Sequence, residues 1–249
     1  MSPAAELPEI RTRWSEVSGG IDAAHAYQQR FDALAEQGVD LDGEARFVHA
    51  LHEAPARILD AGCGTGRVAT ELTRLGHDVV GVDADGAMIE VARERDDTTR
   101  FVHADLATLS LTTQAFAVVL LAGNVVPFLA DGTLVDVLRR LRAHLTTDGR
   151  LVCGWALPGH QPPGAAAVDA DDVDRAAFAA DLSLVVRYSS WDQPSARAEP
   201  AEFLALADGG LSTPVVFAEL DRLRAEYADD PDRALVSARV SGTEPLVQA

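Results

Sequence analysis

From Arg57 onward the chain alternates short apolar segments with helical ones, and this alternation constrains the fold more than any other feature. The apolar segments are short enough for strands. The stretches between them carry helix signals, such as an Asp85 placed to cap a helix that runs to about Arg95. Strands that alternate with helices predict a parallel sheet with helices on both faces, in the α/β class. The expected strands are 57–60, 78–82, 101–104, 115–122, 151–156 and 182–190, and the expected helices are 67–75, 85–95, 131–145 and a stretch from about 172.

Two more helices are expected before the first strand, over residues 21–37 and 43–51. In the first of them Tyr27, Phe31 and Leu34 recur at helical spacing, so they share one face. Such a stripe is typical of core packing, but it would also suit a helix that covers a ligand, and both interpretations stay open. Residues 1–20 are expected to form a flexible tail.

The 249 residues suit one domain, which we expect over 21–249. Within it, 21–52 would be cap helices, 57–191 the core of alternating strands and helices, and 192–249 a C-terminal extension. The extension has its own pattern, helical over 215–227 and weakly alternating over 234–240, which fits a last strand.

The composition limits the binding partners and the cellular compartment that we expect for this chain. Lys and Arg number 21 against 39 Asp and Glu, a formal net charge of −18, which argues against nucleic acid and anionic membrane as partners. No apolar run is long enough to span a membrane, and the first ten residues do not form a signal peptide. Cys63 and Cys153 form no framework of disulfides, so we expect a cytoplasmic protein with a small-molecule substrate; its oligomeric state stays open.

The most specific motif is the stretch from Asp60 to Gly66, which reads DAGCGTG where the first strand ends and the next helix begins. Gly62, Gly64 and Gly66 let the backbone turn sharply and let a ligand approach the main chain closely. The helix that follows presents free N–H groups and a positive dipole end. In open α/β sheets ligands bind at such a turn, beyond the carboxyl ends of the strands.

Polar side chains follow the other strands at the same edge of the sheet. Asp83 ends the second strand, where a carboxylate can accept hydrogen bonds from both hydroxyls of a ribose. Asp105 follows the third strand and could accept from an adenine amino group, and Asn124 follows the fourth. The glycine-rich turn and these three polar residues follow four strands at one edge of the sheet. Together they predict a single nucleoside-binding site at that edge.

Two kinds of nucleoside cofactor could bind there. A nicotinamide dinucleotide usually meets glycines spaced GxGxxG, which leave room for its pyrophosphate, whereas Gly62, Gly64 and Gly66 are spaced GxGxG. The carboxylate of Asp60 would repel a pyrophosphate and attract the ammonium of an amino acid. The motif therefore favours a ligand that combines adenine, ribose and an amino acid.

These residues resemble the class I, Rossmann-like S-adenosylmethionine-dependent methyltransferases, in particular their small-molecule type. The resemblance rests on residues 59–66 with Asp83 and Asp105, and covers about 27–191. It implies a doubly wound, mostly parallel seven-stranded sheet with one antiparallel strand. It also implies S-adenosylmethionine as the cofactor, with its methionine end at Gly62, its ribose at Asp83 and its adenine at Asp105 and Leu106. An aromatic and a basic residue of the helix before the sheet, here Tyr27 and Arg30, would approach the methionine end.

Methyl transfer from a sulfonium is an in-line displacement that depends mainly on proximity and alignment, so a base is needed only when the nucleophile arrives protonated. Among the seven histidines, His160 follows the fifth strand at the ligand edge and His25 lies near Tyr27, so these two are the candidate bases. No metal-ligand spacing is present, and no metal site is expected. Two alternatives stay open: an NAD(P)-dependent oxidoreductase, and a catalytically silent module that binds S-adenosylmethionine.

Overall fold

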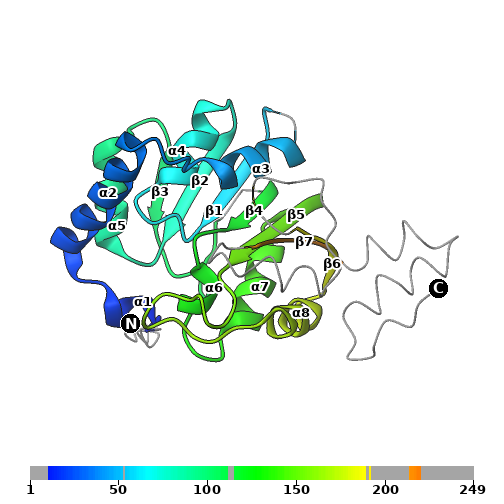
Figure 1. The fold of residues 1–249 in the computed structure, drawn as a ribbon. Helices are drawn as coiled ribbons and strands as arrows, with labels where there is room; N and C mark the ends of the chain where they lie inside the picture. The colour runs from blue at the N-terminus through cyan, green and yellow to red at the C-terminus, as the bar shows by residue number, and fades with distance from the viewer. Residues whose placement is uncertain (1–10, 53, 112–114, 189–190, 192–212, 220–249) are drawn as a thin grey trace, which may run out of the picture.

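In the computed structural model, which describes residues 11–52, 54–111, 115–188, 191 and 213–219, one sheet with helices on both faces organises the chain (Figure 1). The strands lie in the order β3-β2-β1-β4-β5-β7-β6. Their bounds are β1 Arg57–Ala61, β2 Asp78–Asp83, β3 Arg100–His103, β4 Phe116–Leu121, β5 Leu145–Trp155, β6 Leu182–Arg187 and β7 Thr213–Glu219. The helices are α1 Trp14–Val17, α2 Gly20–Glu36, α3 Gly43–Leu51, α4 Arg67–Arg74, α5 Gly86–Arg95, α6 Val125–Phe128, α7 Leu134–Arg142 and α8 Ala170–Ala179.

Strands β1 to β5 pair in parallel, whereas β7 lies between β5 and β6 and runs antiparallel to both. The chain order reverses at β1, which has β2 on one side and β4 on the other, and such a switch point is where open α/β sheets bind ligands. The expected α/β, Rossmann-like fold is confirmed.

The side chains of the sheet alternate between two cores because successive residues of a strand point to opposite faces. In β1, Ile58 packs with α3, α4 and α5, whereas Leu59 packs with α7 and α8. Both residues are fully buried, as strands covered on two faces require. Figure 1 shows these two groups of helices on opposite sides of the sheet.

Most expected elements lie within a few residues of their observed bounds. Asp85 caps α5 as expected, since its side chain accepts a hydrogen bond from the backbone N–H of Ala87 at 2.9 Å. Asp131 does not cap the helix that follows it: α7 begins after Thr133, and Asp131 instead accepts both hydrogen bonds of the Arg13 guanidinium at 2.8 and 3.1 Å.

Two expectations for the ends of the chain need correction. The helix expected over 215–227 is wrong at its start, because Thr213–Glu219 form β7 in the sheet. The strand expected over 234–240 lies outside the described residues. Residues 1–10 of the expected flexible tail also lie outside them, but Trp14–Val17 form the helical turn α1 and pack against the domain. The ring of Trp14 contacts Tyr27 and Phe128, which explains why this segment is ordered.

Within the part of the chain that the structure describes, no helix is long and apolar enough to cross a membrane. Cys63 and Cys153 are both buried and unpaired.

Candidate functional site

A cavity of about 520 Å³ opens at the carboxyl edge of the sheet, and it gathers residues that are far apart in the sequence. Nine of the predicted site residues line it, from the N-terminal helix to the segment after β5. These are Tyr27, Arg30, Gly62, Gly64, Asp83, Asp105, Leu106, Asn124 and His160. A smaller cavity of about 50 Å³ shares Tyr27, Gly62 and Gly64 with the first and is also lined by Asp60.

The glycine-rich loop after β1 shows why each of its glycines is needed. All three have positive φ, where L side chains are strained. A Cβ on Gly64 would meet no atom within 4 Å, so this position borders open space at the cavity. A Cβ on Gly66 would lie 2.7 Å from the ring of Phe101. Gly64 therefore leaves room for a ligand, whereas Gly66, which lines neither cavity, lets the new helix pack closely on the sheet.

Asp83 ties the end of β2 to the glycine-rich loop. One carboxylate oxygen accepts a hydrogen bond from the backbone N–H of Gly64 at 2.8 Å, and the other accepts from Asp85 at 2.9 Å. Burial raises the pKa of Asp83, while these two backbone donors oppose that shift. Each carboxylate oxygen keeps a second lone pair, so a fixed Asp83 can still accept from two ribose hydroxyls.

Asp60 is a buried carboxyl group beneath the same loop. Its side chain is 2% exposed, and its Oδ2 has no hydrogen-bond partner among the described residues. Burial raises the pKa of Asp60 to about 7, against the attraction of the Arg67 guanidinium. A buried carboxylate oxygen without a hydrogen bond is energetically unfavourable, and a ligand that donates a hydrogen bond to it would relieve this cost. A ligand with an ammonium group fits this position, and a pyrophosphate does not.

Asp105, Leu106 and Asn124 continue the lining along the strand ends. Asp105 follows β3, and its Oδ1 accepts from the backbone N–H of Ala107 at 2.7 Å, which holds the turn that presents Leu106. Asn124 has left-handed backbone geometry with φ of 69°, and its Oδ1 accepts from the backbone N–H of Ala156 at 2.7 Å. The side chain of Asn124 thus joins the ends of β4 and β5, and its lining role is partly structural.

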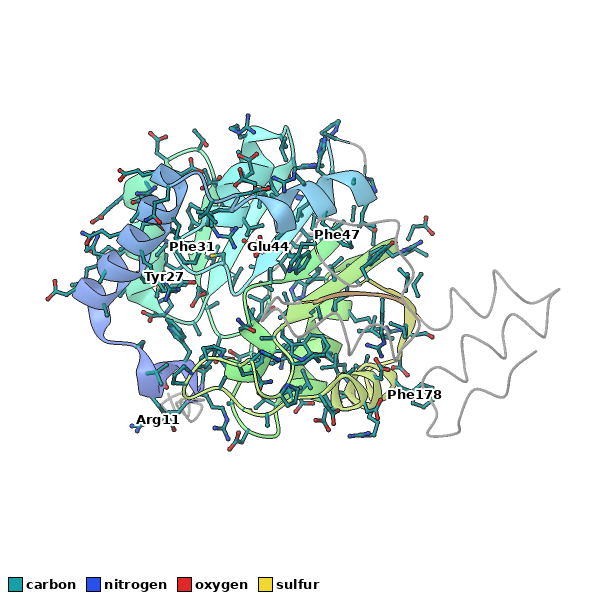
Figure 2. The ribbon with its side chains drawn as sticks, viewed as in Figure 1. Arg11, Tyr27, Phe31, Glu44, Phe47 and Phe178 are labelled. Atoms are coloured by element: carbon teal, nitrogen blue, oxygen red, sulfur yellow. The ribbon has the colours of Figure 1, made fainter. Side chains whose placement is uncertain are left out.

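Helix α2 brings Tyr27 and Arg30 to the cavity. Its buried residues are Ala24, which packs with Met88 and Val91 of α5, and Gln28, which accepts a hydrogen bond from the Thr65 hydroxyl at 2.5 Å. Tyr27 and Phe31 are only partly buried and lie on the side of α2 toward the domain (Figure 2). Tyr27 also packs against the cluster of Ala24, Met88 and Val91, so it helps to dock α2 as well as lining the cavity.

Arg30 lies over this aromatic pair. Its guanidinium carbon is 5.4 Å from the centroid of the Tyr27 ring and 5.3 Å from that of Phe31. Arg67, at the start of α4, lies 5.3 Å from the Phe31 ring and makes a bidentate ion pair with Glu44 of α3 at 2.8 and 3.1 Å. The carboxylate of Glu44 occupies Arg67, so Arg30 is the guanidinium best placed to meet a ligand's carboxylate.

The two candidate bases fall in different places. His160 lines the large cavity from a turn in which its backbone N–H donates to the carbonyl of Leu157 at 3.0 Å. His25 lines neither cavity, and its Nε2 lies 3.6 Å from Glu94 on an exposed face of α2 and α5. The structure brings His160 to the site and leaves His25 outside it.

One wall of the cavity consists of residues that the sequence pattern does not predict. Trp14 and Val17 of α1, Phe128 at the end of α6, and Pro162 and Pro163 after β5 all line it. No local pattern marks these residues, because they come from three segments that are far apart in the sequence and meet only in the folded chain. The one available signal was Trp14 itself, a large aromatic residue in a segment otherwise typical of a polar tail.

Comparison with known proteins identifies the family. A family model described as a methyltransferase domain matches residues 58–149. The crystal structure of a TehB-like SAM-dependent methyltransferase from Corynebacterium glutamicum is 31% identical, with a TM-score of 0.68; the match covers 80% of this chain and 98% of that one. The chain belongs to the class I S-adenosylmethionine-dependent methyltransferases, whose methyl donor is S-adenosylmethionine.

Curated relatives match over shorter stretches. A demethylmenaquinone methyltransferase of Clavibacter sepedonicus is 30% identical over 60% of this chain and 62% of its own length. A ubiquinone biosynthesis O-methyltransferase of Nitrosococcus oceani is 38% identical over 26% of this chain and 32% of its own. The match thus spans about a third to three fifths of these relatives, which leaves the acceptor of this chain open.

Proposed function

We propose that this protein transfers the methyl group of S-adenosylmethionine to a small-molecule acceptor. The observation that carries the proposal is Asp60, a buried carboxyl with an unpartnered oxygen beneath a glycine-rich loop, at the edge where the polar side chains of four strands meet. Removal of such a group from water is unfavourable unless a donor compensates it. The ammonium of the methionine moiety is that donor.

Each part of the cofactor would be held by a different set of residues. Asp60 and the loop at Gly62 and Gly64 would hold its methionine end, with Arg30 on the carboxylate. Asp83 would accept from the ribose, and Asp105 with Leu106 would hold the adenine. When bound, the cofactor supplies an electrophilic methyl group, whose bond to sulfur breaks as the bond to the acceptor forms, with the electron pair left on sulfur.

The protein's own contribution is alignment and exclusion of water. Tyr27 and Trp14 close the cavity from the N-terminal side, and their rings meet edge to face with centroids 6.2 Å apart. Positioning of this kind can lower a barrier by about 7–11 kcal/mol. Where the acceptor carries a proton on its nucleophilic atom, His160 is the residue placed to receive it at an imidazole nitrogen.

We also propose the arrangement of the whole chain. It would be a single domain over 21–249, in which 21–52 cap the site, 57–191 form the cofactor-binding core and the extension from 192 supplies β7 as the antiparallel strand of a complete seven-stranded sheet. The two buried free thiols suit the reducing environment of the cytoplasm.

The alternative functions make different predictions. An NAD(P)-dependent oxidoreductase would need to place a pyrophosphate near Asp60, which the charge of that residue opposes. Calorimetric titration with S-adenosylmethionine and, separately, with NADH and NADPH tests the proposal, and binding of a dinucleotide alone would reject it. A silent binding module would bind the cofactor but transfer no labelled methyl group to any fraction of a metabolite extract.

A further inference from the structure

The large cavity has two ends of different chemistry. The end over β1, β2 and β3 carries Asp83, Asp105 and the glycine-rich loop, which suit the cofactor. The end over β4 and β5 is formed by α1, α6 and the segment after β5. Its lining is mostly apolar, with Trp14, Val17, Phe128, Leu129, Pro162 and Pro163, and it also includes the uncharged hydroxyl side chains of Thr12 and Thr133. Since the cofactor would take the first end, the acceptor would take the second.

Trp14 is a fixed wall where the second end meets the first. Its Nε1–H donates to Asp85 at 2.8 Å, so the polar atom of the indole is already satisfied. Its ring packs edge to face against Phe128, with centroids 5.4 Å apart and an interplanar angle of 85°. Because the ring is held on two sides, it presents a rigid apolar surface to the cavity.

Few charges reach this end. Of the described charged side chains that line the cavity, Arg30, Asp83 and Asp105 belong to the cofactor end, which leaves His160 as the titratable group near the acceptor. Arg13, next to Trp14 in sequence, is held by a bidentate ion pair with Asp131. A carboxylate or phosphate in this space would lose its hydration without gaining a free cation, which is unfavourable.

We infer that the acceptor is a planar ring compound that carries a hydroxyl group but no anionic group, and that it binds against Trp14. This inference rests on the proposed function and specifies its substrate class. The hydroxyl proton passes to His160 as the oxygen forms its bond to the methyl carbon, and the electron pair of the breaking carbon–sulfur bond stays on sulfur. Trp14 is then the residue that selects for ring shape, and the lack of a free cation among the described residues of this end selects against an anionic acceptor.

The test uses two probes with the same ring system, 2-naphthol and 2-naphthoate. Each is titrated by calorimetry into protein saturated with S-adenosylhomocysteine. We expect 2-naphthol to bind at least about tenfold more tightly than 2-naphthoate, because the carboxylate pays desolvation that the hydroxyl does not. Equal binding of the two, tighter binding of the carboxylate, or no binding of 2-naphthol would overturn the inference.

Substitution of the wall gives a second arm. Trp14→Ala should weaken 2-naphthol binding about tenfold or more, and Trp14→Phe should restore most of it, since a ring remains. If Trp14→Ala does not fold, as judged by thermal melting, Phe128→Leu probes the same wall and should weaken 2-naphthol at least about threefold. A folded Trp14→Ala or Phe128→Leu variant with unchanged 2-naphthol affinity would reject the role of this wall.

Binding of S-adenosylhomocysteine distinguishes failure of the proposed function from failure of the acceptor class. If S-adenosylhomocysteine does not bind the unsubstituted protein, the proposed function fails and the acceptor class falls with it. If it binds but the probes behave alike, the proposed function stands and only the acceptor class is rejected.

Discussion

The two ends of the large cavity differ in how they are built. The cofactor end is formed by turns that directly follow β1, β2 and β3, and its polar groups are held by hydrogen bonds to the backbone, such as that from the N–H of Gly64 to Asp83. The acceptor end is formed by α1, α6 and the segment after β5, which meet through contacts between rings, such as Trp14 with Phe128. One end is built from backbone turns at adjacent strand ends, and the other from side chains of segments that lie outside the sheet.

This difference teaches that the same cavity can combine a general half and a specific half. Strand-end turns can bind the same nucleoside in many proteins because the backbone supplies the geometry. Segments from outside the sheet can vary without disturbing that geometry, and loops and appendages tolerate change best. Substitutions at Gly64, Asp83, Asp60 and Arg30 test whether the cofactor end behaves as a separate unit built by the backbone.

The largest effect is expected for Gly64→Val. The new side chain would extend into open space that the methionine moiety needs, so S-adenosylmethionine affinity should fall at least about 100-fold by calorimetry. The fold should survive, since a Cβ at this position meets no atom within 4 Å.

Gly38→Val is the matched control for backbone strain. Gly38 also has positive φ and open space around its Cβ, but it lines neither cavity. It should lose a similar amount of thermal stability and keep its cofactor affinity. Retained tight binding in a folded Gly64→Val variant would show that the glycine-rich loop is not the binding site.

Asp83→Ala should have the next largest effect. Loss of a charged acceptor that serves two hydroxyls should cost about 1.5–3 kcal/mol of binding free energy, or roughly 10- to 150-fold in affinity. Asp78→Ala is the control, because Asp78 begins the same strand at its opposite end and pairs with Arg57 at 3.0 Å. Calorimetry in which the two variants bind the cofactor equally well would contradict the assignment of the ribose to Asp83.

The sequence predicts the cofactor end of the cavity well and the acceptor end poorly. The glycine-rich loop, Asp83, Asp105 and the cap at Asp85 carry local signals, and each lies where the pattern places it. Trp14 and Phe128 carry none, because their contact joins segments more than a hundred residues apart in the printed sequence. Local periodicity cannot report such a contact.

The error at β7 has a related cause. Val215, Val216 and Phe217 suit either a helix face or a strand, and β-branched residues gain their preference from the sheet around them. Pairing with β5 and β6 on both sides decides in favour of a strand, and that pairing is not visible from residues 215–227 alone.

A smaller effect should appear in the pH dependence of cofactor binding. Burial raises the pKa of Asp60 to about 7, and a cationic ligand selects its ionised form. Affinity should therefore rise with pH, by about eightfold between pH 6 and pH 7.5, as the ionised fraction of Asp60 grows. Calorimetry at fixed ionic strength measures this rise.

Asp60→Asn keeps the size of the side chain and removes its titration, so this variant should bind weakly with little dependence on pH over the same range. An unaltered pH profile in Asp60→Asn would mean that another group is responsible for the dependence.

The smallest effect is expected at the junction of the two ends, where α2 lies over the methionine position. Arg30→Ala should lower S-adenosylmethionine affinity about fivefold or more, by loss of a charge-assisted contact to the cofactor carboxylate. If Tyr27, Phe31 and Leu34 are only a packing stripe, the affinity should not change. Tyr27 packs against the cluster that docks α2 and also lines the large cavity with Arg30, so the affinity of Arg30→Ala separates a lid from a packing stripe.

Arg95→Ala is the matched control, since Arg95 holds the same helix through an exposed bidentate pair with Asp32 at 2.9 and 3.1 Å and lines neither cavity. It removes a docking contact of α2 without removing a ligand contact, so its cofactor affinity should stay within about twofold of the unsubstituted protein, as exposed pairs contribute little. Hydrogen exchange gives an independent readout: bound cofactor should slow exchange of the amides of residues 27–31 in the Arg95→Ala variant as it does in the parent protein. If Arg30→Ala leaves the affinity intact and the cofactor leaves these amides unprotected, α2 is only a packing element, and the cofactor end is built by the sheet alone.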